Sequence, residues 1–295
     1  MNEVSFTHLS IPYNLKKKYY RMKRLCALLV LMFAVVVVFA AKIETVSTYS
    51  KVMNKEIKAV VVTPDNYSTA KRLPVIYLLH GYGGNYNDWI TQGKSFIPLV
   101  DTYDVIVVCP DGAIGSWYFD SPMDKNFQYE TYVTKELIPF VDSHYATIAD
   151  RAGRGITGLS MGGHGALYLS FRHQDLFGVA GSMSGGVDFR PFPNNWDIAK
   201  RLGTYAENPD NWEKNTVVNL VHLLTPKSLS LIIDCGSEDF FYKVNCQLHE
   251  KLLDRNIPHD FIIRPGAHNW PYWNNSIQYQ MLFMSNFFTK TTPVK

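Results

Sequence analysis

Short apolar runs alternate with amphipathic stretches along the chain from Ile57 onward. The apolar runs are rich in β-branched side chains and mostly apolar throughout, which is typical of strands buried on both faces of a sheet. They are Ile57–Thr63, Leu73–Leu79, Asp104–Cys109, Gly155–Gly158, Val179–Ser184, Leu229–Asp234 and Phe261–Arg264. The helix-like stretches are Thr131–His144, Gly163–His173, Asp239–Arg255 and Trp270–Thr289. This alternation predicts an α/β fold with a mostly parallel central sheet and helices on both faces.

The N-terminal end has a different pattern. Residues 16–24 contain six basic side chains and no acidic one, and the 17 residues from Leu25 to Ala41 carry no charge. A basic segment, an apolar run and small residues at its end are typical of a secretory signal, and the run is also just long enough for an uncleaved anchor. We expect residues 1–41 to be a signal peptide or a membrane anchor and residues 42–295 to be one domain. The protein is then secreted or periplasmic, or anchored in the membrane by residues 25–41.

Composition and charge exclude several classes of protein. The 295 residues are 46 % hydrophobic and 19 % charged, which is typical of a globular protein. The net charge of +3 comes from the N-terminal basic segment, without which 23 basic residues face 26 acidic ones. We therefore expect no nucleic-acid surface. Cys109, Cys235 and Cys246 show no zinc-ligand spacing, and we expect free thiols, although a bridge between Cys235 and Cys246 stays open.

A serine motif follows the strand that ends at Gly158. The sequence Gly158-Leu-Ser160-Met-Gly162-Gly has the pattern G-x-S-x-G, with a strand before it and a helix after it. A sharp strand-to-helix turn holds such a serine in a strained backbone conformation, and side chains at the flanking glycines would clash. The motif predicts that Ser160 is a catalytic nucleophile.

A serine hydroxyl needs a base, and the base needs an orienting acid, in the chain order serine, acid, histidine. His268 lies in a glycine-containing loop after the last predicted strand, and we expect it to be the base. Asp239, after the tight turn at Gly236, is the favoured acid. Glu238 and Asp234 remain alternatives.

The oxyanion of the reaction needs two backbone donors. One is expected at the residue after the nucleophile, Met161, and the other in the glycine-rich loop His80-Gly-Tyr82-Gly-Gly84, at Tyr82.

In combination, these motifs resemble the esterase D / feruloyl esterase group of the α/β-hydrolases. The residues that carry the resemblance are Leu79–Gly84 with Trp89, Ser116–Tyr118, Gly158–Gly163, Asp234–Asp239 and Gly266–Trp270. The group includes S-formylglutathione hydrolases and mycolyltransferases. The resemblance implies an α/β-hydrolase fold without a large lid, the triad Ser160, Asp239 and His268, and an oxyanion hole at Tyr82 and Met161. Ala267 stands where the group usually has a glycine.

Aromatic side chains near the expected site suggest the substrate. Trp117, Tyr118 and Trp270 are expected to bind a sugar or a phenolic acyl group, with core packing an equal alternative for Trp270 and Trp273. We expect a secreted serine esterase that needs no metal or cofactor and acts on feruloyl or acetyl esters of carbohydrates. The alternatives are an acyltransferase of the mycolyltransferase type and a non-catalytic carbohydrate-binding protein on the same fold.

Overall fold

The computed structural model describes residues 13–14, 17–23 and 41–292. The chain divides into a unit of residues 1–39 and a second unit of residues 40–295. In the first unit, residues 17–23 are helical and exposed. The apolar run expected as a signal or anchor lies outside the described residues, except for Ala41. No helix in the described ranges is long and apolar enough to cross a membrane.

Eight strands form one sheet in the order β1-β2-β4-β3-β5-β6-β7-β8. Their bounds are β1 Lys42–Ser50, β2 Lys55–Thr63, β3 Val75–Leu79, β4 Ile106–Pro110, β5 Arg154–Gly158, β6 Val179–Met183, β7 Ser230–Gly236 and β8 Asp260–Arg264. From β4 to β8 all neighbours are parallel, whereas β1 pairs with β2, and β2 with β4, in antiparallel fashion. The mostly parallel sheet is therefore confirmed. The pattern missed β1 because most of its side chains are exposed at the edge of the sheet.

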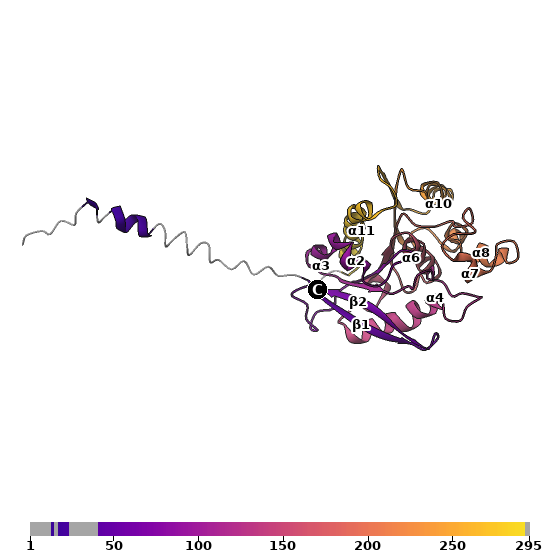
Figure 1. Ribbon diagram of the computed structural model, residues 1–295, viewed down its shortest axis with the longest axis horizontal. Helices are drawn as coiled ribbons and strands as arrows, with labels where there is room; N and C mark the ends of the chain where they lie inside the picture. Colours follow the sequence, from indigo (N-terminus) through magenta and orange to yellow (C-terminus); the bar gives the residue numbers. More distant parts are fainter. Residues whose placement is uncertain (1–12, 15–16, 24–40, 293–295) are drawn as a thin grey trace, which may run out of the picture. The chain divides into compact units, whose positions relative to one another are not determined.

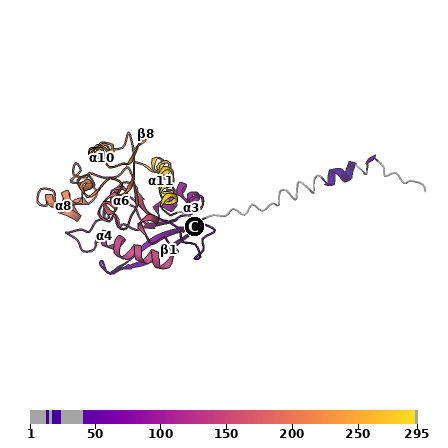
Figure 2. The same ribbon diagram turned by 180° about the vertical axis from the view of Figure 1, so that it is seen from behind.

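Helices cover both faces of this sheet (Figures 1 and 2). The α-helices are α2 Asp88–Thr91, α3 Ile97–Tyr103, α4 Tyr129–Thr131, α5 Ile138–His144, α6 Met161–Arg172, α7 Ile198–Leu202, α8 Pro209–Asn215, α9 Val217–Leu220, α10 Tyr242–Asp254 and α11 Trp270–Thr291. The 3₁₀-helices are η1 Lys94–Phe96, η3 Arg151–Gly153 and η4 Val221–Leu223, and η2 Tyr132–Leu137 is a π-helix. Helices α3 and α11 contact each other on one face. Helices α5, α6 and α10 cover the other face.

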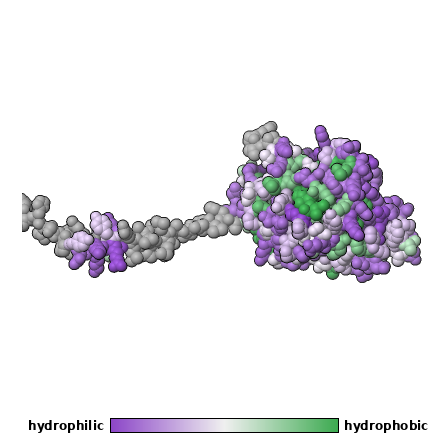
Figure 3. Space-filling view, turned by 90° about the horizontal axis from the view of Figure 1, so that it is seen from above, coloured by the Kyte–Doolittle hydropathy of each residue, from purple (hydrophilic) through white to green (hydrophobic). Residues whose placement is uncertain are grey.

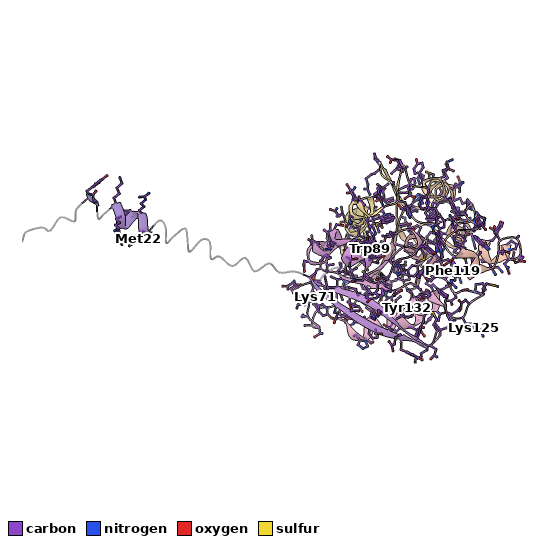
Figure 4. The ribbon with its side chains drawn as sticks, viewed as in Figure 1. Met22, Lys71, Trp89, Phe119, Lys125 and Tyr132 are labelled. Carbon is purple, nitrogen blue, oxygen red and sulfur yellow. The ribbon has the colours of Figure 1, made fainter. Side chains whose placement is uncertain are left out.

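The two faces have separate hydrophobic cores because strand side chains alternate. In β3, Val75, Tyr77 and Leu79 join one core, while Ile76 and Leu78 join the other. Large aromatic side chains fill the interior, among them Trp89, Phe119 and Tyr132, whereas Lys71 and Lys125 lie at the surface (Figure 4). Hydrophilic residues dominate the face in Figure 3, with a compact hydrophobic patch near its centre and smaller hydrophobic areas toward its edges.

The longest connection between neighbouring strands runs from β6 to β7 and carries α7, α8, α9 and η4. Within it, the buried indole of Trp212 donates a hydrogen bond from Nε1 to the carbonyl of Gly203 at 2.9 Å, which joins α8 to the residue after α7. The sequence pattern predicts no helix or strand in this connection. It brings Trp196 to the carboxyl edge of the sheet, where the serine motif lies.

Candidate active site

Ser160 occupies the sharp turn between β5 and α6. Its backbone has φ 55° and ψ −116°, a conformation that side chains other than glycine rarely adopt. Its N–H donates to the carbonyl of Met183 at 2.9 Å, which fastens the turn to β6. A Cβ on Gly162 would lie 2.5 Å from the carbonyl oxygen of Leu79, and one on Gly158 would lie 2.7 Å from the backbone of Gly162. The glycines are therefore required because backbone segments approach each other at these points.

A chain of hydrogen bonds joins three of the residues expected from the sequence. Ser160 Oγ lies 2.9 Å from His268 Nε2. His268 Nδ1 lies 2.9 Å from Asp239 Oδ2 and 3.1 Å from Oδ1. The carboxylate accepts a hydrogen bond from Nδ1–H, which leaves the lone pair of Nε2 facing the serine hydroxyl. Residues from the ends of β5, β7 and β8 therefore converge at one edge of the sheet.

The three acid candidates differ in their contacts. Asp234 is completely buried and bonds to Arg264 and to the hydroxyl of Tyr272, so it faces away from His268. Burial raises the pKa of the Asp234 carboxyl, and these partners oppose the shift. Glu238 is exposed to solvent. Only Asp239, of the three, contacts the imidazole.

Aromatic side chains fix the ring of His268 on three sides. Its centroid is 4.2 Å from that of Phe240, 5.6 Å from Phe241 and 4.9 Å from Trp273. The indole of Trp273 donates from Nε1 to Ser184 Oγ at 3.1 Å, which fixes its own position. The imidazole is thus held by packing as well as by the carboxylate.

The loop after β3 is tied down by the buried ring of His80. The N–H of Gly112 donates to His80 Nε2 at 2.7 Å, and Nδ1 donates to the carbonyl of Gly81 at 2.8 Å. The ring therefore joins the loop after β3 to the loop after β4. Among the described residues, the backbone N–H groups of Tyr82 and Met161 have no protein acceptor, as donors of an oxyanion hole require.

The expectation that Trp117 and Tyr118 contact substrate is wrong. Their exposed fractions are 1 % and 0 % because both side chains pack in the core beneath the site. Tyr118 instead supports the loop from behind, where its hydroxyl lies 3.2 Å from the backbone nitrogen of His80. Trp117 donates from Nε1 to the carbonyl of Trp196 at 3.2 Å.

A cavity of about 400 Å³ opens above the serine. Its lining residues are Gly81, Tyr82, Asp88, Leu159, Ser160, Trp196, Phe240, His268, Trp270 and Trp273. Trp270 was expected here, and it also packs edge-on against Trp89 with centroids 5.2 Å apart. Trp196 and Phe240 were missed. Phe240 directly follows the acid in sequence, which was a usable signal, but Trp196 lies far from any strand end.

The described residues contain no group of three or more His, Cys, Asp and Glu side chains able to hold a metal ion. Cys109, Cys235 and Cys246 are free thiols, as expected.

Comparison with known proteins identifies the family. A family model described as "Putative esterase" matches residues 50–284, which is most of the chain. The chain belongs to this esterase family. It is accordingly a serine carboxylic ester hydrolase with an α/β-hydrolase fold, and no large lid is evident in the part of the chain that the structure describes.

Individual relatives of this esterase act on different acyl groups. An acetyl esterase of Caldicellulosiruptor saccharolyticus is 27 % identical over 263 residues, which cover 82 % of this chain and 98 % of that one. A diacylglycerol acyltransferase/mycolyltransferase of Mycolicibacterium smegmatis is 26 % identical over 247 residues, covering 69 % and 74 %. The solved structure of a ferulic acid esterase superposes with a TM-score of 0.74 at 28 % identity, covering 85 % and 99 %.

Proposed function

We propose that Ser160, His268 and Asp239 are the catalytic triad of this esterase, and that it hydrolyses acyl esters of carbohydrates through a covalent acyl-enzyme. The observation that carries the proposal is the continuous hydrogen-bonded chain from Ser160 Oγ through His268 to Asp239 at the floor of an aromatic cavity. Such a chain makes a weak nucleophile reactive at neutral pH.

The reaction proceeds in two displacements. Ser160 Oγ attacks the ester carbonyl while its proton passes to His268 Nε2, and Asp239 stabilises the imidazolium. Collapse of the tetrahedral intermediate breaks the bond to the alcohol oxygen, which leaves with the proton from Nε2. Water then attacks the acyl-enzyme, gives its proton to Nε2 and releases the acid, and the proton returns to Ser160.

The free N–H groups of Tyr82 and Met161 serve as the oxyanion hole in this mechanism. Met161 opens α6, so the positive end of the helix dipole adds to its effect. Each such donor is worth about 100- to 1000-fold in rate. Since the donors are backbone groups, their position depends on the packing of the loop against the serine turn.

Feruloyl or acetyl groups on carbohydrates are the proposed substrates. The cavity is larger than an acetyl group needs, and its walls carry Trp196, Phe240 and Trp270, whose faces suit a sugar or a phenolic ring. The similarity to an acetyl esterase and a ferulic acid esterase supports the same class.

The location of the enzyme is likewise a proposal. Residues 1–41 direct the chain out of the cytoplasm as a signal peptide or anchor, and residues 42–295 form the single catalytic domain. The basic segment and the apolar run in the sequence support this.

Replacement of the nucleophile tests the proposal. Ser160→Ala should lose all but a trace of 4-nitrophenyl acetate and methyl ferulate hydrolysis and all labelling by a fluorophosphonate, with an unchanged circular dichroism spectrum. Ser170→Ala is the matched control, since Ser170 lies on the same helix and bonds only to the carbonyl of Leu167. Retention of more than a few per cent of wild-type activity in Ser160→Ala would refute the assignment.

The similarity to a mycolyltransferase favours one second candidate, transfer of the acyl group to a sugar hydroxyl. Incubating the enzyme with an ester donor and increasing concentrations of a sugar acceptor distinguishes hydrolysis from transfer. Hydrolysis predicts that free acid stays the main product, whereas transfer predicts that the acylated sugar replaces it.

A further inference from the structure

One carboxylate of the cavity has no cationic partner. The lining residues include no lysine or arginine, and the carboxylate is that of Asp88, the first residue of α2. Its Oδ1 accepts a hydrogen bond from the neutral side-chain amide of Asn85 at 3.2 Å. Within the described part of the chain, no lysine, arginine or histidine nitrogen lies within 4.0 Å of it. Its charge therefore acts on whatever occupies the cavity.

The backbone makes room for this carboxylate at the oxyanion loop. A Cβ on Gly84 would lie only 2.2 Å from Asp88 Oδ2 and 3.0 Å from the ring of His80. The side chain is consequently held against the loop that carries Tyr82. Its partial burial raises the pKa of the Asp88 carboxyl, while the nearby His80 ring opposes the shift.

The other carboxylates near the cavity are compensated. Asp239 is paired with His268 and its side chain is fully buried. Asp197, at the rim, lies 2.9 Å from Lys200 Nζ and accepts a hydrogen bond from the hydroxyl of Tyr82 at 3.3 Å. Asp88 thus sets the sign of the field inside a cavity whose remaining walls are largely aromatic.

We propose that Asp88 is a specificity residue that makes the cavity select uncharged and cationic esters and reject esters carrying a carboxylate. The uncompensated carboxylate repels an anionic group, whereas the aromatic faces and the same carboxylate both attract a cation. It also accepts hydrogen bonds from hydroxyl groups, so a neutral sugar is accommodated. A like charge a few ångströms away in a partly buried site is worth about tenfold in kcat/KM. This inference rests on the proposed catalytic role of Ser160.

Matched ester pairs test the inference on the full-length protein. One pair carries the charge on the acyl chain, 4-nitrophenyl hydrogen adipate against 4-nitrophenyl hexanoate. The other carries it on the alcohol, 4-carboxyphenyl acetate against phenyl acetate. The quantity measured is the ratio of kcat/KM between neutral and anionic members, compared between wild type and Asp88→Asn, so that intrinsic differences in ester reactivity cancel.

We expect the ratio in at least one pair to fall about tenfold in Asp88→Asn and to be restored in Asp88→Glu. Asp254→Asn is the control, because Asp254 is exposed at the far end of α10 and its replacement changes the net charge equally. An unchanged ratio in both pairs, or an equal change in Asp254→Asn, would overturn the inference. Activity toward the neutral esters that persists in Ser160→Ala would instead overturn the proposed function.

Discussion

The close backbone approach at Gly162 offers a sharp test of how the oxyanion hole is built. Gly162 follows Met161 on α6, and a Cβ there would lie 2.5 Å from the carbonyl oxygen of Leu79 and 2.6 Å from that of His80. Ordinary C···O contacts are about 3.3 Å. Gly162→Ala must therefore push the serine turn and the oxyanion loop about 0.8 Å apart. The atoms met are backbone, so no side-chain rotation relieves the contact.

This displacement separates the two proposed oxyanion donors. Met161 moves with the helix, and Tyr82 moves with the loop, so at least one N–H leaves its place. We expect kcat for 4-nitrophenyl acetate to fall about 100- to 1000-fold, the effect of losing one donor, with little change in KM. Overpacking should also lower the free energy of unfolding by about 1–3 kcal/mol.

The assay combines steady-state kinetics with urea unfolding, and Gly155→Ala is the control. Gly155 lies on β5, the strand that precedes the serine turn. Its Cβ would meet the side chains of Val179 and Met284 at 3.0 and 3.2 Å, and these side chains are able to shift. The control should therefore keep kcat within about threefold of wild type while it loses some stability. A Gly162→Ala enzyme with wild-type kcat and unchanged stability would refute the account of the hole.

Three further outcomes follow from the structure. Asp239→Asn should lower kcat about 10⁴-fold with the fold intact, because the amide of Asn donates to His268 Nδ1 and leaves a protonated Nε2 facing the serine. A loss of less than tenfold in steady-state kinetics would contradict this. Tyr272→Phe should lower the free energy of unfolding in urea by about 1–3 kcal/mol, since it leaves the buried Asp234 short of a donor. Burial, opposed by two backbone carbonyl groups, lowers the pKa of His164 from 6.5 to about 4. Between pH 6.5 and pH 4 the unfolded chain therefore binds a proton that the folded chain does not. The free energy of unfolding should fall over this range by up to about 3 kcal/mol. Urea unfolding at several pH values measures this dependence, and His164→Gln should weaken it.

Local sequence determined the chemistry of this protein. The turn around Ser160 needs glycines on both sides because backbone segments touch there, so the motif is visible without a structure. The buried strands are equally visible, because parallel strands covered on both faces must be apolar throughout. The exposed edge strand β1 has no such requirement, and its pattern gave no signal.

The tertiary structure decided which side chains face the cavity. Trp117 and Tyr118 follow a strand at the correct edge, yet both point into the core, whereas Trp196 reaches the cavity from the long connection after β6. The sequence favoured Asp239 and left Asp234 open, and the folded structure shows that Asp239 contacts His268 while Asp234 bonds to Tyr272. A residue's type and its neighbours in sequence fix what it is able to do. The direction of its side chain depends on packing between segments distant in sequence, and that packing exists only in the folded chain.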